Sequence, residues 1–386
     1  MRRLIAAGWA LCLLLAAAAV PAQVVADEAR LRDLHEELRH IPVTVKDREG
    51  REETRNIPLT IFHPDGDGPF PLVIMNHGRS NNRAQQGRQR YEALSRYLVG
   101  KGFTVFLPTR VGYADTFGDF DPEASGPCAV RMLAPVAQAA SDQVLATLAY
   151  ARTLPFVDAS RWLVMGQSVG GFAAVATVSR HPAGLVGGIN FAGGVGGNPE
   201  RSPGTPCNPQ QVSQLWAAQA AGAAGTEIPM LWVYWQNDQY WGADNPKRWH
   251  EAWVQAGGQA EFHSLAPVGS DGHSGSSADM DHWVPLAEAF LARLGFTQPG
   301  GVPRPAPTAF ARIDDTGRLP PGNAARNSLY RRFLDARPPR AFAIGPQGES
   351  GWARGDWALG RALGYCQRRG EPCKLYAVDD DVVWAP

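Results

Sequence analysis

The feature that most constrains the fold of this chain is a regular alternation of unbroken apolar runs with helical segments. Runs such as Pro71–Met75, Phe103–Leu107 and Trp162–Met165 are each followed by a stretch with helical periodicity. Strands that are apolar on both faces are typical of a parallel sheet covered by helices on both sides. The sequence therefore predicts an α/β fold with a mostly parallel, doubly wound sheet. Further strands are expected at Leu185–Phe191, Pro229–Trp235 and Glu261–Leu265.

The N-terminus has the pattern of a secretory signal peptide. Arg2 and Arg3 precede an apolar stretch, Leu4–Val20, which is followed by small residues suited to cleavage. A membrane anchor is the alternative, but the apolar stretch is at the short end for a span. We therefore expect residues 1–26 to be removed and the mature protein to be secreted or periplasmic, without a membrane segment.

Charge and cysteine content narrow the function classes. The chain has 37 basic and 37 acidic residues, a balance that argues against binding to nucleic acid or to an anionic membrane. Four cysteines would remain after cleavage, and an even number in an exported chain suggests disulfides. We predict the pairs Cys128–Cys207 and Cys366–Cys373. No cysteine has the spacing of a structural zinc site, and the sequence indicates neither a metal nor a cofactor.

The remaining chain is expected to divide into two folded parts. Residues 28–40 have the pattern of a short amphipathic helix ahead of the first strands. In the C-terminal part, a strand at Arg340–Ile344, a helix at Asp356–Arg368 and a hairpin turned at Asp379–Asp381 indicate a small α+β module. The predicted divisions are a signal peptide (1–26), an α/β domain (27–297), a Pro/Gly linker (298–308) and the C-terminal module (309–386).

Gly166-Gln167-Ser168-Val169-Gly170 matches the pattern Gly-x-Ser-x-Gly. It follows the apolar strand Trp162–Met165 and opens a helix. A nucleophilic serine requires such a tight strand-to-helix turn, and small neighbours keep side chains out of the crowded space. The sequence therefore predicts Ser168 as a nucleophile above the sheet.

The partners of a serine nucleophile are expected later in the chain, in the order acid then histidine. Asp238 follows the strand Pro229–Trp235, whereas Asp244, the nearest alternative, lies where it would cap the next helix. His273 lies in a loop between glycines after the last strand. His263, within that strand, and His282, near a helix start, are less well placed. We expect His273 to act as the base and Asp238 to orient it.

Two backbone N–H groups should form an oxyanion hole. One belongs to Val169, directly after the nucleophile, and the other to Arg79, in the loop after strand Pro71–Met75. Gly78 would let the backbone approach the substrate. His77 in the same loop is interpreted as structural, because His273 fills the role of base.

These motifs together resemble the dienelactone hydrolase-like branch of the α/β-hydrolases. The resemblance covers about residues 50–296 and rests on four segments: Pro71–Gly78, Gly166–Gly171, Asn237–Asp238 and Asp271–His273. It implies the α/β-hydrolase fold and a Ser-His-Asp triad, in a branch that acts on esters and lactones, while related branches cleave peptides or acetyl groups. Dienelactone hydrolases proper use a cysteine nucleophile, so Ser168 departs from them and the lactone substrate is not implied. The C-terminal module is foreign to the small members.

This reasoning favours a small carboxylic ester with a short acyl chain as the substrate, cleaved through an acyl-enzyme. Tyr113, Tyr240 and Trp241 follow strands at the catalytic edge and are expected to line the pocket. No long apolar lid segment is present, and the loop Gly194–Gln210 offers no paired glutamates to hold a peptide amino group. A serine peptidase of the same fold is the alternative. A non-catalytic binding protein acting through the C-terminal module is a second alternative.

Overall fold

The computed structural model describes residues 30–385, except 223–227, 299–301, 321–323, 356 and 368–372. The predicted signal peptide (1–26) and part of the predicted linker lie outside the described residues. Within the described part of the chain, no helix is long and apolar enough to cross a membrane. Two separate sheets organise this part, a large one and a small one.

The large sheet has eight strands in the order β1-β2-β4-β3-β5-β6-β7-β8. Only β2 runs antiparallel to its neighbours, β1 and β4, and the strands from β4 to β8 are all parallel. This confirms the predicted α/β class. The strands are β1 (Glu37–Lys46), β2 (Glu52–Phe62), β3 (Phe70–Asn76), β4 (Thr104–Pro108), β5 (Val157–Gln167), β6 (Leu185–Phe191), β7 (Met230–Trp235) and β8 (Ala260–Leu265).

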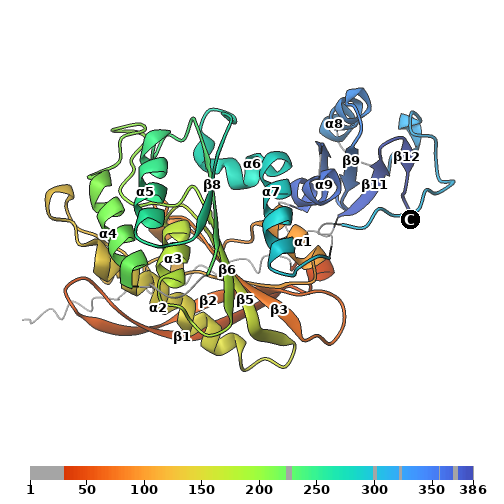
Figure 1. Ribbon diagram of the computed structural model, residues 1–386. Helices are drawn as coiled ribbons and strands as arrows, with labels where there is room; N and C mark the ends of the chain where they lie inside the picture. Colours follow the sequence, from red (N-terminus) through yellow and green to blue (C-terminus); the bar gives the residue numbers. More distant parts are fainter. Residues whose placement is uncertain are drawn as a thin grey trace, which may run out of the picture.

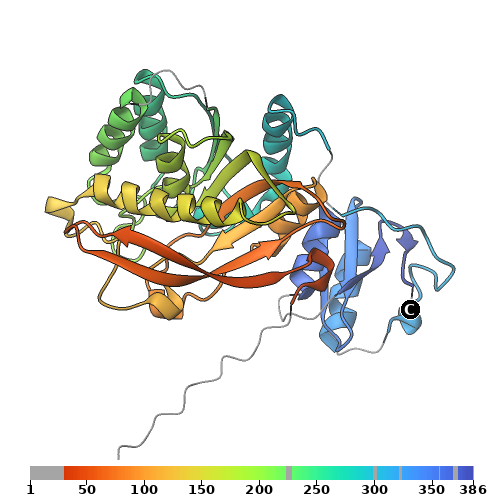
Figure 2. The same cartoon turned by 90° about the horizontal axis from the view of Figure 1, so that it is seen from below.

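Helices cover both faces of this sheet (Figures 1 and 2). The chain moves one way along the sheet from β3 to β4 and the other way from β4 through β5 to β8. Because crossovers between parallel strands are right-handed, this reversal places the first helix on the opposite face from the next four. One face is covered by α1 (Glu92–Gly100) and α7 (Met280–Arg293), and the other by α2 (Leu133–Ala151), α3 (Val169–Val178), α4 (Pro209–Gly222) and α5 (Asp244–Gln255).

The alternation of side chains along β3 explains why its sequence is apolar throughout. Leu72 and Ile74 are buried in the core beneath α2 to α5, whereas Val73 and Met75 are buried in the core beneath α1 and α7. Each such side chain removed from water stabilises the fold by about 1.5–3 kcal/mol. One prediction is wrong at the edge of the sheet where β1 lies.

Residues 28–40 do not form the expected amphipathic helix. Residues 28 and 29 lie outside the described residues, a short 3₁₀ turn spans Arg32–Leu34, and β1 begins at Glu37. The pairing of β1 with β2 over ten residues outweighs the weak local helical preference. Leu31 and Leu34, whose spacing suggested a helix, are instead buried in the core on the face of the sheet that α1 and α7 cover.

The small sheet lies to one side of the large one, beside α1 and α7 (Figure 1). Its order is β10-β9-β11-β12, all antiparallel, with one helix on each face. The predicted small α+β module is therefore present, although β10 and α8 were not predicted. Its elements are α8 (Ala324–Asp335), β9 (Arg340–Ile344), β10 (Ser350–Arg354), α9 (Ala358–Cys366), β11 (Lys374–Val378) and β12 (Asp381–Val382).

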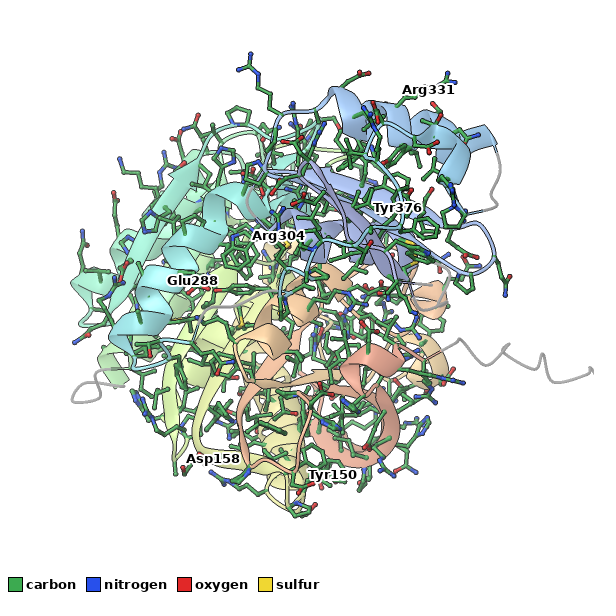
Figure 3. All side chains as sticks on the ribbon, turned by 90° about the vertical axis from the view of Figure 1, so that its right-hand side faces the viewer. Tyr150, Asp158, Glu288, Arg304, Arg331 and Tyr376 are labelled. Atoms are coloured by element: carbon green, nitrogen blue, oxygen red, sulfur yellow. A yellow bond between two sulfur atoms is a disulfide. The ribbon has the colours of Figure 1, made fainter. Side chains whose placement is uncertain are left out.

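The module is packed against the large domain through polar and aromatic contacts. Arg361 donates to Asp281 of α7 (2.6 Å), and the ring of Trp357 meets that of Tyr97 edge-on at 5.0 Å between centroids. Nearby, Lys101 donates to Glu288 (2.8 Å), which Figure 3 shows on α7, and to the carbonyl of Gln298 at the start of the connection. The two parts therefore share an interface.

Both predicted disulfides are present. Cys128–Cys207 joins the loop before α2 to the loop before α4, and Cys366–Cys373 joins the end of α9 to the start of β11. Arg131, buried next to the first bridge, donates to Ser125 Oγ (3.3 Å) and to the carbonyl of Cys207. The bridge and this guanidinium thus hold the same two loops, and the disulfides fit a chain exported to an oxidising compartment.

Replacing both members of the first bridge, Cys128→Ser with Cys207→Ser, should lower the free energy of unfolding by about 2–4 kcal/mol, because the 79-residue separation leaves a long loop open in the unfolded chain. Equilibrium unfolding in urea measures this change. Cys366→Ser with Cys373→Ser, which opens a separation of only 7 residues, is the control with the smaller expected effect. Free thiols at Cys128 and Cys207 in the unreduced protein would contradict the pairing.

Candidate active site

Ser168 occupies a strained turn between β5 and α3. Its backbone has φ 57° and ψ −124°, a conformation that non-glycine residues rarely adopt. A Cβ added at Gly166 would lie 2.0 Å from the carbonyl oxygen of Gly170, and one at Gly170 would lie 2.0 Å from that of Asn76. The two glycines of the motif are therefore required by close packing of the turn.

Asp238 and His273 meet at the carboxyl edge of the sheet, in the loops after β7 and β8. His273 Nδ1 lies 3.0 Å from Asp238 Oδ2, and both side chains are buried. The other carboxylate oxygen accepts the backbone N–H groups of Tyr240 (2.7 Å) and Trp241 (3.0 Å). Both oxygens of Asp238 are thus engaged, so the carboxylate is fixed in orientation.

Aromatic rings and backbone bonds hold the imidazole in place. Tyr240 stacks on the ring of His273 with 3.9 Å between centroids, and Trp241 meets it edge-on at 5.4 Å. Asp271 Oδ1 accepts N–H groups from both His273 and Gln239, each at 2.9 Å, which links the two loops. With Nδ1 donating to the carboxylate, Nε2 is left as the acceptor that a general base needs.

The structure brings the predicted Ser168, Asp238 and His273 together and separates the alternatives from them. Ser168 and His273 line one and the same cavity. Asp244 lies in the first turn of α5, and His263 lies in β8 beside Glu261. The side chain of His282 is 73% exposed and contacts Asp279.

The loop after β3 lies against the serine turn. A Cβ on Gly78 would lie 2.6 Å from Gln167 Oε1 and 3.1 Å from Ser168 Cβ, so this approach needs a glycine. Arg79 and Val169, the expected oxyanion-hole residues, line a cavity together with Ser168. Sequence reasoning did not single out Gln167, whose Nε2 donates to the carbonyl of His273 (3.0 Å).

His77 is placed as a structural residue. Its ring is buried, and Nε2 accepts the backbone N–H of Arg110 at 3.1 Å. Burial and the neighbouring Arg110 guanidinium hold the pKa of His77 well below its usual range. The imidazole is therefore neutral and serves to hold the loops after β3 and β4 together.

An ion-pair cluster anchors the loop that carries Arg79. The guanidinium of Arg79 binds both carboxylate oxygens of Asp121, at 3.2 and 2.6 Å, and Arg83 contacts the same carboxylate at 2.9 Å. Asp121 belongs to the long loop after β4 and carried no recognisable sequence signal. Such bidentate pairs fix geometry as well as adding energy.

Ser168 lines two cavities, which also share Arg79, Ser80 and Tyr240. The arginine-lined cavity, of about 410 Å³, is further bounded by Arg83, Glu123 and Trp241. The histidine-side cavity, of about 400 Å³, is further lined by residues that include Gln85, Gln89, Tyr91 and His273.

Tyr113, which was expected to line the pocket, lies instead beneath it. The side chain is fully buried, and its hydroxyl donates to Glu123 Oε2 at 2.6 Å. It supports the wall of the arginine-lined cavity from behind.

Three features decide the fold. They are a mostly parallel sheet with helices on both faces, a serine turn after β5, and loops after β7 and β8 that carry Asp238 and His273. The large domain has the α/β-hydrolase fold. Among the described residues of this hydrolase-fold chain, no cluster of three or more His, Cys, Asp or Glu side chains could hold a metal ion.

No family model and no curated protein sequence matches the chain. Similar solved structures include Pyrococcus horikoshii acylaminoacyl peptidase (TM-score 0.46, 16% identity, 68% of this chain and 42% of the peptidase covered). Another is a Klebsiella pneumoniae protein described as a dienelactone hydrolase (TM-score 0.41, 18% identity, 68% of this chain and 98% of that protein covered). A third is a Pyrococcus furiosus esterase (TM-score 0.45, 12% identity, 68% of this chain and 92% of the esterase covered). The chain thus spans less than half the length of the peptidase.

Asp121→Asn should reduce kcat for a small ester by about tenfold to a hundredfold with a smaller change in KM, because it loosens the loop that carries Arg79. Steady-state kinetics on p-nitrophenyl acetate give this split. Asp119→Asn is the matched control, since that nearby carboxylate is 85% exposed and contacts only the distant Arg51. Equal losses in both variants would argue against a role for Asp121 in positioning the loop.

Proposed function

We propose that this chain is a secreted serine hydrolase that cleaves carboxylic esters with short acyl groups through an acyl-enzyme. The observation that carries the proposal is the contact of 3.0 Å between His273 Nδ1 and Asp238 Oδ2, beside a serine held in a strained strand-to-helix turn. This is the arrangement that activates a serine hydroxyl by a neighbouring base, with the base oriented by a third group.

In the proposed acylation step, Ser168 Oγ attacks the ester carbonyl carbon and its proton passes to His273 Nε2. Asp238 stabilises the resulting imidazolium, and its fixed orientation means that little rearrangement is needed. The imidazolium then gives its proton to the departing alkoxide. In deacylation, water attacks the acyl carbon and gives a proton to His273 Nε2. His273 then returns that proton to Ser168 Oγ as the acid is released.

The backbone N–H groups of Arg79 and Val169 are the proposed donors to the oxyanion. Both residues line the cavity onto which Ser168 opens, and Val169 begins α3, so the helix N-terminus adds a favourable dipole. Each such donor is typically worth about 10²–10³ in rate.

The two cavities support an assignment of the two halves of the ester. The leaving alkoxide must receive a proton from His273, so the alcohol half belongs in the histidine-side cavity and the acyl half in the arginine-lined one. A long alkyl chain in the latter would lie against the polar groups of Arg79, Arg83 and Glu123, which costs free energy. Short acyl groups are favoured for this reason.

The charges around the site support an ester over a peptide. A peptide amino terminus needs a carboxylate to hold it, and among the described residues lining the two cavities Glu123 is the only acidic one. Its carboxylate is already bound by Arg110 Nε at 2.5 Å and by the hydroxyl of Tyr113. An alkoxide is also a better leaving group than an amide anion, so an ester depends less than a peptide on exact placement of the proton that His273 delivers.

Ser168→Ala should abolish ester hydrolysis and leave the fold intact, with a loss of about 10⁶ in kcat. A fluorophosphonate probe should label the wild-type protein at Ser168, as located by peptide mass spectrometry, and should not label the variant. Circular dichroism checks the fold. Labelling that persists in the variant would refute the nucleophile, and absence of both labelling and hydrolysis in the wild type would favour a non-catalytic binding protein.

The substrate preference is tested by comparing kcat/KM for p-nitrophenyl acetate, butyrate and decanoate with that for dipeptide anilides. We expect the acetate and butyrate to be cleaved at least about tenfold faster than the decanoate, and the anilides to be the slowest, because the acyl cavity is polar and the peptide terminus finds no free carboxylate. Anilide cleavage as fast as acetate cleavage would instead support a serine peptidase.

A further inference from the structure

A further cavity lies beside the histidine-side cavity, next to the C-terminal module. This cavity, of about 330 Å³ and here called the module-side cavity, is lined by the start of α1, the turn after His273 and Gly364 and Tyr365 of α9. Tyr91 belongs to the walls of both cavities. The two cavities are therefore neighbours, one beside His273 and the other beside the module.

Two chain segments contribute different residues to the two cavities. On one side, Gly87 and Gln89 line the histidine-side cavity, and the next residues along the chain line the module-side one. On the other side, His273 lines the first cavity and Ser276 and Ser277 line the second. The residues that follow His273 in the chain thus line the module-side cavity.

The lining of the module-side cavity is close to neutral. Its two arginines, Arg88 and Arg90, both bind the carboxylate of Glu36, Arg90 through Nε at 2.8 Å. Glu92 is the carboxylate in the lining itself, and burial raises its pKa to about 7. Charge therefore does not select a strongly acidic or basic ligand here.

Hydrogen-bonding groups and tyrosine rings dominate what remains of the groove. Gln89, Ser276 and Ser277 supply amide and hydroxyl groups, and Tyr91 and Tyr365 supply rings at either side. Neutral ligands that are rich in hydroxyl groups and have an apolar ring face suit such a surface, because they use both kinds of contact. Sugars have this combination, whereas plain alkyl alcohols do not.

We propose that the alcohol half of the ester is a glycan chain, whose acylated sugar occupies the histidine-side cavity and whose next sugar occupies the module-side cavity against Tyr365. This inference rests on the proposed ester hydrolysis, which places the leaving alcohol beside His273. It gives the C-terminal module a direct part in substrate binding, while the chemistry stays in the large domain.

The test uses the full-length protein and compares kcat/KM for acetylated maltotriose, 6-O-acetylglucose and p-nitrophenyl acetate. We expect the trisaccharide ester to be preferred over the monosaccharide ester. The ratio of kcat/KM for the trisaccharide ester to that for p-nitrophenyl acetate should fall by about tenfold in Tyr365→Ala, which removes a ring. Ser277→Trp, at an exposed position that tolerates a large side chain, should lower the same ratio by filling the cavity. Arg331→Ala, on α8 (Figure 3), is the control and should keep the wild-type ratio.

The outcomes separate this inference from the proposed function. If p-nitrophenyl acetate is cleaved but the ratio is the same in Tyr365→Ala, Ser277→Trp and the wild type, the glycan groove is refuted and the esterase activity stands. A preference for peptides carrying an O-acetylserine over the sugar esters would also overturn it. If p-nitrophenyl acetate is not cleaved and Ser168 is not labelled, both proposals fail.

Discussion

Close packing of the serine turn against the end of β3 is the constraint on which the rest of the site depends. Gly170 brings the start of α3 onto the carbonyl groups of Asn76 and His77, and Gly78 brings the next loop onto Ser168 Cβ. Asn76 Nδ2 donates to the carbonyl of Met165 at 3.1 Å and holds the two strand ends together. Only this packing lets Arg79 and Val169 line the same cavity as Ser168. A single added methyl group at Gly170 would push these backbones apart, and one at Gly78 would displace the amide of Gln167 and crowd Ser168 Cβ.

The acid and histidine loops are fastened to one another by a second set of contacts. Asp271 joins them through two backbone N–H groups, and Asn237 exchanges hydrogen bonds with the backbone of Val268. Gln167, next to the serine, reaches the carbonyl of His273. These bonds fix the relative positions of residues that are far apart in the chain, and preorganisation of this kind lowers the cost of reaching a charged transition state.

The site is asymmetric about Ser168. The arginine-lined cavity has Arg79 and Arg83 in its wall, whose charges are partly balanced by Asp121 and Glu123, whereas the histidine-side cavity shares Arg79 and is otherwise lined mainly by glutamines, serines and tyrosines. In the proposed mechanism the proton passes through His273, so the less charged cavity takes the alcohol half of the substrate and the more charged cavity the acyl half. The module lies beside the less charged cavity, because α9 packs against α1.

The sequence by itself determined the fold class, the serine turn and both disulfide pairs. The fold class and the serine turn depend on short segments of sequence. Continuous apolar runs require a sheet buried on two faces, and Gly166 and Gly170 mark a turn that few other residues allow. It also ranked Asp238 and His273 above Asp244, His263 and His282, because a residue just after a strand lies at the sheet edge. Local patterns were misleading where partners decide the structure, as at residues 28–40, where pairing with β2 replaced an expected helix.

Only the tertiary structure decided which side chains face the substrate. Tyr113 has the sequence position of a pocket residue, yet Glu123 draws its hydroxyl into the interior. Asp121 and Tyr365 have no distinctive sequence context. Asp121 binds Arg79, which lies 42 residues away in the chain, and Tyr365 shares a cavity with the start of α1 in the large domain. A sequence records the spacing of residues along one chain, whereas a cavity is defined by segments that meet from different parts of it. For that reason the proposed chemistry could be inferred from the motif, but the cavities and the proposed role of the module could not.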